Sequence, residues 1–224
     1  MRLFMGMRAP RNHEVSTDAA GVVEAVGLDA TRFKVDDEVM TDMFASGHFG
    51  AFAEYVCARE KAFEPIPTGM SFEEAATLPH SAVLALQATR MRDGRTFKPG
   101  DTVLIDGASG NVDPFAVQIA KFMGAEVTGV ARGDKLDFVR SLGADRVVDY
   151  EAVDYTRDSE RYDWIVAVDS HYPLRAVRRV LKPNGVYLTL SSRRSPSTAR
   201  SRGGRTSSPP SVSSASTSSA CDGP

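Results

Sequence analysis

Cysteine is nearly absent from this sequence of 224 residues. The two that occur, Cys57 and Cys221, lie far apart in the chain, and the second falls in a polar C-terminal segment. Neither a disulfide framework nor a cysteine-rich zinc site can be built from them, which indicates a protein of a reducing compartment.

Long apolar runs are also lacking. The sequence contains no run of about 18 consecutive apolar residues, which a membrane-spanning helix would need. The opening MRLFMGMRAPRNHEV lacks the apolar core of a secretion signal. We therefore expect a cytoplasmic protein with no membrane partner.

The chain has no excess of positive charge. The formal net charge is −2, and the first 192 residues hold 22 of the 27 basic side chains but 28 of the 29 acidic ones. A nucleic-acid partner would favour a basic patch, so none is expected.

Branched aliphatic residues are almost missing from the segment 193–224, which contains Val212, eleven serines and five arginines. Such a segment cannot bury enough apolar surface to offset the entropy lost on ordering. The sequence predicts a disordered tail here.

The full chain is 42% hydrophobic, enough for a core. Residues 20–66 contain AGVVEAVG, DDEVM and the alternating stretch GAFAEYVCA, which predict strands of a small β domain. A capping box at Ser71 and Glu74 then predicts a helix, and Pro79 opens a second helix that would bridge two domains.

Strands alternate with helices from residue 101 onward, a pattern typical of an α/β fold with a doubly wound parallel sheet covered on both faces. We expect strands at 101–106, 126–131, 145–148, 163–168 and 185–190, and helices at 113–123, 134–141 and 172–181.

The stretch GASGNVDP follows the first of these strands and precedes a helix, where a doubly wound sheet binds a dinucleotide. In one interpretation the pyrophosphate binds there at Ser109, Gly110 and the amides of Asn111 and Val112, at the start of the helix.

A second interpretation concerns the end of the same stretch. Asp113 and Pro114 are a suitable N-cap and first helical residue. The carboxylate would then compete with phosphate for the same amides. Both interpretations stay open, and weakened binding is the compromise between them.

The end of the second strand, in EVTGVARGDK, bears on the choice of cofactor. An NAD-binding site places an acidic residue there. Arg132 and Lys135 occur instead, and their charges suit the 2′-phosphate of NADPH. The alternative is an ordinary solvated helix start.

Together these stretches resemble the zinc-free medium-chain dehydrogenase/reductases, in their quinone oxidoreductase branch. The matching segments occur in family order and are TDAAGVVEAVG, DDEVM, GAFAEYVCA, ATLPHSAVLALQ, KPGDTVLIDGASG, FAVQIAK, GAEVTGV, SLGADRVVDY and VLKPNGVYL. The resemblance implies a partial GroES-like β domain over 1–88, an incomplete dinucleotide-binding (Rossmann) domain over 89–192 and the tail. It also implies that family elements are missing at both ends, as in an interior fragment.

The resemblance further implies NADPH-dependent reduction of a small-molecule quinone or α,β-unsaturated carbonyl, and it allows a homodimer. Lys135 and Tyr150 match positions that bind NADPH in that family. No catalytic residue is identified, and His171 is interpreted as a surface residue rather than a proton donor.

Metal binding is not expected, because the segment with Thr17 and Asp18 stands where zinc-dependent relatives carry a Gly-His-Glu motif. Asp18 is either a turn or capping residue or part of a substrate cleft.

The alternative function is a non-catalytic, degenerate fragment with weak or no nucleotide binding, suggested by Asn111, Asp113 and the missing ends.

Overall fold

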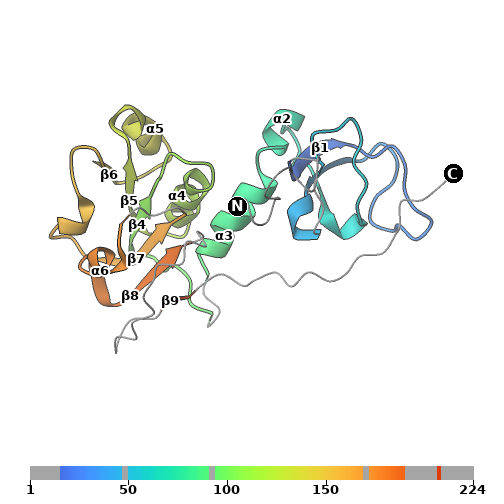
Figure 1. Cartoon of the computed structure of the whole chain (residues 1–224). Coiled ribbons are helices and arrows are strands. Elements are labelled where there is room, and N and C mark those ends of the chain that lie inside the picture. The colour runs from blue at the N-terminus through green and yellow to red at the C-terminus, as the bar shows by residue number, and fades with distance from the viewer. Residues whose placement is uncertain (1–15, 47–49, 91–93, 169–171, 190–205, 208–224) are drawn as a thin grey trace, which may run out of the picture. The chain divides into compact units, whose positions relative to one another are not determined.

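The computed structural model describes residues 16–46, 50–90, 94–168, 172–189 and 206–207. Their contacts form two compact units that divide after His80 (Figure 1). The dividing point lies inside helix α3 (Pro79–Ala88), so this helix begins in the first unit and continues in the second.

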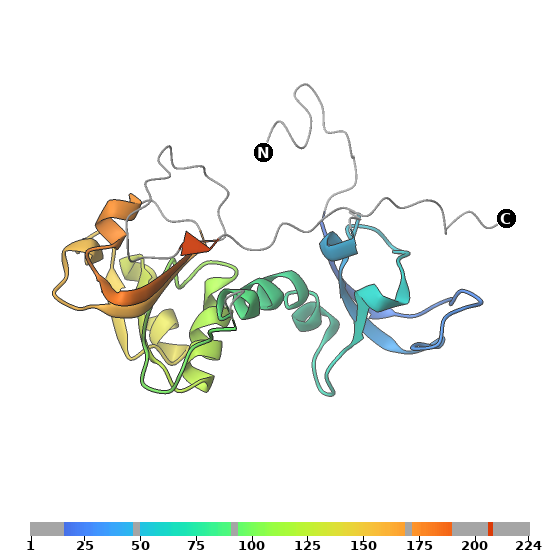
Figure 2. The same ribbon diagram turned by 90° about the horizontal axis from the view of Figure 1, so that it is seen from below.

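The first unit contains a three-stranded antiparallel sheet in the order β1-β2-β3, formed by Asp18–Val22, Glu38–Asp42 and Phe63–Pro65. Ala20 pairs with Met40, and Met40 pairs with Glu64. Short helices η1 (Met43–Ser46), η2 (Glu60–Ala62) and α2 (Phe72–Ala75) complete this unit, and the loop that joins β1 to β2 projects beyond the strands (Figure 2).

Two local predictions about this unit have opposite outcomes. The capping box is confirmed: the Glu74 amide donates to Ser71 Oγ, and the Ser71 amide donates to a Glu74 carboxylate oxygen. The strand predicted within 50–58 is wrong, since these residues adopt no regular structure. Phe52 and Tyr55 are 80% and 71% exposed. An alternating pattern forms a strand only beside a partner, and no described strand pairs with this segment.

The second unit contains a parallel sheet in the order β6-β5-β4-β7-β8-β9. Its strands are β4 (Thr102–Asp106), β5 (Glu126–Ala131), β6 (Arg146–Asp149), β7 (Tyr162–Ala167), β8 (Leu181–Thr189) and β9 (Thr206–Ser207). The chain therefore runs outward from β4 through β5 and β6, and returns to the other side of β4. This order confirms the predicted doubly wound α/β fold.

Successive side chains of each strand point to opposite faces of the sheet. Both faces are buried because a layer of helices covers each of them. Val103 and Ile105 pack with α4 (Asp113–Phe122), α5 (Leu136–Ser141) and part of α3. Leu104 faces the other layer, which contains η4 (Tyr155–Arg157) and α6 (Leu174–Val177). The two layers lie on opposite sides of the strands in Figure 2.

Two predictions near the end of the sheet need correction. The helix predicted over 172–181 is only the four residues of α6, and β8 begins at Leu181 rather than 185. The extra strand residues arise from a bulge, because Tyr162 pairs with Leu181 whereas Trp164 pairs with Val186.

Within the segment 193–224, for which the sequence predicts disorder, Thr206 and Ser207 form β9 and pair in parallel with Tyr187 and Leu188. The outer side of β8 offers unpaired backbone groups that such a segment can satisfy. The remainder of the tail lies outside the described residues.

Candidate dinucleotide site

The switch in strand order, between β4 and β7, marks the candidate site. In a doubly wound sheet, ligands bind beyond the carboxyl ends of the strands at this point. Segments that follow β4, β5 and β6 gather at that edge and contain every residue that the sequence predicts for cofactor binding: Ser109, Gly110, Asn111, Val112, Arg132, Lys135 and Tyr150.

The turn from β4 to α4 is anchored to the neighbouring strand. Gly107, with φ of +89°, is in the left-handed region that favours glycine, and its amide and that of Ala108 donate to the Val130 carbonyl at 3.0 and 2.8 Å. The Gly110 amide donates to the Gly107 carbonyl at 2.8 Å. The hydrogen bonds of these three amides fix the turn.

Three amides of the same turn are free to bind a ligand. Within the described part of the chain, the backbone N–H groups of Ser109, Asn111 and Val112 donate to no protein acceptor. They lie at or just before the start of the ten-residue helix α4. Free N–H groups and the positive end of the helix dipole together favour an anion such as a pyrophosphate.

Asp113 does not have the role predicted for it. The N-cap of α4 is Val112, with no side-chain capping bond, and Asp113 is the first helical residue, which places Pro114 second. The reason is the backbone of Val112, which is already helical (φ −89°, ψ −39°). The carboxylate of Asp113 therefore does not accept the amides of Asn111 and Val112.

Instead, the Asp113 side chain is buried under the glycine turn, with 4% of its surface exposed. A Cβ added at Gly110 would lie 3.0 Å from Asp113 Oδ2 and 3.2 Å from the Gly107 carbonyl oxygen. Asp113 Oδ1 is buried without a hydrogen-bond partner in the described structure. Burial, with a smaller contribution from the charge of Asp106, raises the pKa of Asp113 to about 7 despite a hydrogen bond from its own amide.

Asp106 ends β4 and faces the second layer of the unit. Its Oδ2 accepts the hydroxyl of Tyr155 at 3.0 Å. The Tyr155 ring packs edge-on against Tyr172, with centroids 4.7 Å apart. Asp106 was not among the residues predicted for the site, although a carboxylate at the carboxyl end of the first predicted strand is a recognisable signal.

An ion pair that was not predicted from the sequence lies at the end of β5. Arg132 Nε and Nη2 donate to the two carboxylate oxygens of Asp134, each at 2.7 Å. Lys135 is exposed and forms no ion pair among the described residues. The Tyr150 amide donates to the Ala131 carbonyl at 3.2 Å, which places exposed Tyr150 beside the end of β5. The predicted basic cluster thus contains one free cation and one paired cation.

The first unit contains a second cluster of polar side chains, around the start of α3. Asp18 Oδ1 accepts the His80 amide at 2.8 Å, so Asp18 caps this helix from β1. His80 Nδ1 lies 3.0 Å from Asp42 Oδ2, and Phe44 packs edge-on against the imidazole. The capping role that was one alternative for Asp18 is therefore observed, and the substrate-cleft role stays a prediction. The His80 and Asp42 pair was not predicted from the sequence.

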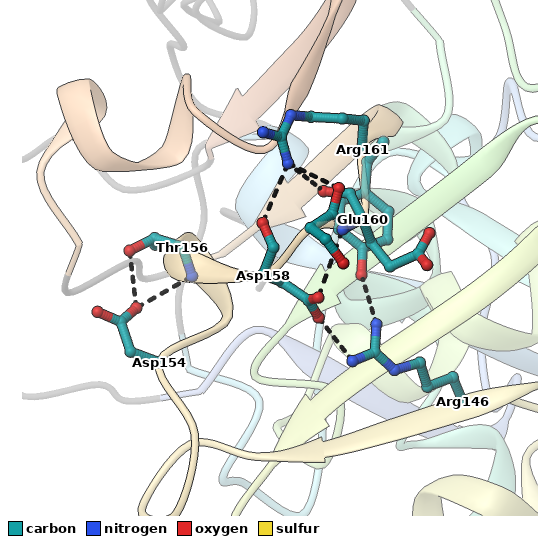
Figure 3. A network of polar contacts seen from close by, with 8 residues as sticks. Arg146, Asp154, Thr156, Asp158, Glu160 and Arg161 are labelled. Atoms are coloured by element: carbon teal, nitrogen blue, oxygen red, sulfur yellow. Dashed lines mark hydrogen bonds and ion pairs between the residues drawn. The ribbon is translucent and has the colours of Figure 1, made fainter.

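A third polar network lies at the amino ends of the parallel strands, away from the switch-point edge. Arg146, the first residue of β6, donates to Asp158 at 2.6 Å and to the Tyr162 hydroxyl at 3.4 Å. Figure 3 shows Asp158 between Arg146 and Arg161, whose guanidinium donates to the Asp158 carbonyl. This network ties the segment before β7 to β6 and has a structural role.

His171, which is interpreted from the sequence as a surface residue, lies outside the described residues. In the described part of the chain no helix is long and apolar enough to cross a membrane. The described His, Cys, Asp and Glu side chains form no group of three or more that could hold a metal ion.

Comparison with known proteins gives the affiliation of the chain. Residues 2–68 match the family model of the alcohol dehydrogenase GroES-like domain, and residues 114–199 match that of zinc-binding dehydrogenases. The quinone-oxidoreductase homolog of Spinacia oleracea chloroplasts is 37% identical over 183 residues, 78% of this chain and 55% of that protein. The trans-enoyl reductase tndF of Aspergillus flavipes is 37% identical over 152 residues, 62% of this chain and 44% of that protein.

Solved structures agree with these relatives. The quinone oxidoreductase from Coxiella burnetii superposes with a TM-score of 0.74 at 28% identity, over 84% of this chain and 58% of that one. The chain spans about half the length of the curated relatives it matches. Strand order, glycine turn and sequence similarity together show that the chain belongs to the medium-chain dehydrogenase/reductase family, as a quinone-oxidoreductase-like member.

Proposed function

We propose that this chain is an NAD(P)H-dependent oxidoreductase that transfers a hydride to a quinone or an α,β-unsaturated carbonyl without zinc. The observation that carries the proposal is the set of free amides at Ser109, Asn111 and Val112, at the start of α4 and at the switch point of the sheet. Relatives named quinone oxidoreductase and trans-enoyl reductase support the choice of acceptor.

The reduced nicotinamide would supply the hydride, and the described residues would hold the rest of the cofactor. The turn amides fit the pyrophosphate because they are unpaired N–H donors at a helix start. Binding there fixes the cofactor against the protein, and proximity is the main requirement for reducing an activated acceptor. Ionised Asp113 fits less well than neutral Asp113, since its charge opposes that of the pyrophosphate.

We further propose NADPH as the preferred cofactor. Lys135 is an exposed cation without an ion pair in the described chain, and Tyr150 lies at the same edge. Both can contact a 2′-phosphate. Arg132 can contribute through the guanidinium N–H groups that Asp134 does not use, but the Asp134 carboxylate offsets part of its charge.

Zinc independence is supported by the chemistry at Asp18. Its Oδ1 already accepts the His80 amide, and burial raises the pKa of its carboxyl, as does the nearby charge of Asp42. A metal ligand must be deprotonated and available. The proposal predicts that a chelator leaves the activity unchanged.

A second function, a non-catalytic member with weak or no nucleotide binding, is favoured by one observation, the buried carboxyl of Asp113 under the glycine turn. The two functions differ in whether NADPH binds at all, and a binding measurement separates them.

The test is a titration of the purified chain with NADPH, followed by protein and cofactor fluorescence and by thermal shift, because a ligand that binds the folded state raises its melting temperature. NADPH oxidation is then measured with a naphthoquinone and with an enone, with and without a chelator. Lys135→Ala should weaken NADPH binding about tenfold or more and NADH binding little, since a charge-assisted contact contributes about 1.5–3 kcal/mol.

Lys98→Ala is the matched control. Lys98 is also an exposed lysine of the second unit, but it precedes β4 and lies toward the amino ends of the strands. The Lys98→Ala variant should bind NADPH and NADH as tightly as the parent does. Binding of neither cofactor would favour the non-catalytic alternative, and equal losses for both in Lys135→Ala would reject the 2′-phosphate contact.

A further inference from the structure

Asp113 combines burial with proximity to the ligand-facing turn. Its Oδ1 has no hydrogen-bond partner in the described structure, and its Oδ2 lies against the backbone of Gly107 and Gly110. A buried carboxylate without a cation or several donors is unfavourable, so such groups take up a proton.

Charges around Asp113 strengthen this preference. Asp106 from β4 adds negative charge, and the Asp106 carboxylate is itself held by the Tyr155 hydroxyl of η4. The turn 107–112 contributes no charged side chain. Burial, the larger effect, and Asp106 together raise the pKa of Asp113 to about 7. Both forms of the carboxyl are therefore populated near neutral pH.

We propose that binding of a dinucleotide at the β4–α4 turn is coupled to protonation of Asp113, so that the neutral carboxyl form binds the pyrophosphate and the ionised form repels it. This inference rests on the cofactor site proposed above and adds a pH control to it. The proton comes from solvent and is held on the carboxyl group, and no other bond changes.

The direction of the effect follows from charge. A bound pyrophosphate adds negative charge beside Asp113 and raises the pKa of its carboxyl further, so the complex holds a proton that the free protein has released. Affinity is then constant below the pKa of the free protein. Above it, the dissociation constant rises by up to about tenfold per pH unit.

The first experiment uses ADP-ribose, which carries the pyrophosphate but neither a nicotinamide nor a 2′-phosphate that titrates near pH 6. Its dissociation constant is measured by calorimetry from pH 5.5 to 8.5 for the parent, Asp113→Asn and Glu151→Gln. The parent and Glu151→Gln should lose affinity above pH 7, whereas Asp113→Asn should not. Glu151→Gln is the matched control because it removes a negative charge from an exposed position after β6 at the same edge.

A second measurement needs no variant. Calorimetry at constant pH in two buffers of different ionisation enthalpy counts the protons taken up when ADP-ribose binds the parent chain. We expect about half a proton at pH 7 and close to one at pH 8. When NADPH replaces ADP-ribose, the parent should again take up more protons than Asp113→Asn, and the difference between the two proteins should be the same.

The outcomes are distinct. A flat profile in the parent, or no proton uptake, overturns the coupling and leaves the cofactor site standing. A falling profile that persists in Asp113→Asn assigns the titration to another group and also overturns it. If neither the parent nor Asp113→Asn binds ADP-ribose at any pH, the coupling is overturned together with the proposed cofactor site.

Discussion

Arg132 and Asp134 form a two-point ion pair at the end of β5, with both nitrogen-to-oxygen distances at 2.7 Å. Their spacing of two residues brings the fork of the guanidinium onto both carboxylate oxygens without help from another element. Asp134 therefore competes with any ligand for the cation that was expected to bind a 2′-phosphate.

Removing this competitor should change the cofactor preference. In Asp134→Asn the guanidinium of Arg132 loses its ionic partner, and the local charge becomes more positive. We expect the ratio of NADPH to NADH affinity to rise about threefold to tenfold, less than a full charge-assisted contact because the site is exposed. Cofactor fluorescence titrations of both proteins measure the ratio.

Asp137→Asn is a suitable control, since Asp137 is an exposed acidic residue of α5 that pairs with Arg140. It should leave the ratio unchanged. A ratio that does not move in Asp134→Asn would mean that Arg132 does not contact the cofactor.

Asp113→Asn should stabilise the protein at neutral pH. The folded state raises the pKa of Asp113 from 3.8 to about 7. The folded protein thus binds more protons than the unfolded chain between these values, and its stability falls as pH rises through them. The variant lacks this loss, so its advantage should grow from near zero at pH 4 to at most about 4 kcal/mol at pH 7 and then stay constant.

Urea unfolding of both proteins at several pH values measures this difference. An advantage that is the same at pH 4.5 and pH 7.5 would contradict the buried, titrating carboxyl. This measurement needs no ligand, so its result is independent of whether the site binds a cofactor.

Capping of α3 by Asp18 can be tested separately. Asp18→Ala leaves the His80 amide without its acceptor and should destabilise the protein by about 1 kcal/mol. Asp18→Asn keeps an oxygen that can accept this amide and should be less harmful. If thermal unfolding shows equal losses for both variants, the negative charge rather than the hydrogen bond is what stabilises α3.

The network in Figure 3 predicts a different pH dependence. Burial alone would raise the pKa of Asp158, but the hydrogen bond from Arg146 and that from the Glu160 amide lower it below 3.8. Its stabilising effect is therefore present above pH 4 and is lost as pH falls through the folded-state pKa. Asp158→Asn should lose about 1 kcal/mol at pH 7, since Arg146 is partly exposed, and the difference should shrink at pH 3. Urea unfolding at pH 7 and pH 3 compares Asp158→Asn with its parent, and a constant difference would contradict the ion pair.

Local patterns in the sequence predicted much of the fold. The β5 strand over 126–131 is where the apolar run placed it, and the Ser71 capping box has both expected hydrogen bonds. The stretch 50–58 behaves differently, because its alternation has the period of a strand but a strand also needs a partner. The pattern contained no information about that partner.

The candidate site was predictable in position but not in chemistry. A glycine turn between strand and helix indicated where the free amides of Ser109, Asn111 and Val112 lie. The same letters suggested that Asp113 would cap the helix, yet Val112 takes the N-cap position and the carboxyl is buried. One residue of difference in the helix start reverses the consequence, from a satisfied carboxylate to a carboxyl with a raised pKa.

The sequence by itself determined the order of strands and helices in the second unit and the position of the glycine turn after β4, because these depend on spacing and on the backbone freedom of glycines such as Gly107. Tertiary structure decided the environment of the two partly or fully buried carboxyl groups at Asp18 and Asp113. Asp18 reaches the amide of His80 from a distant strand, and Asp113 is buried under the turn that joins β4 to α4. Solvation and neighbouring charge set a pKa, and both depend on contacts between segments far apart in the chain.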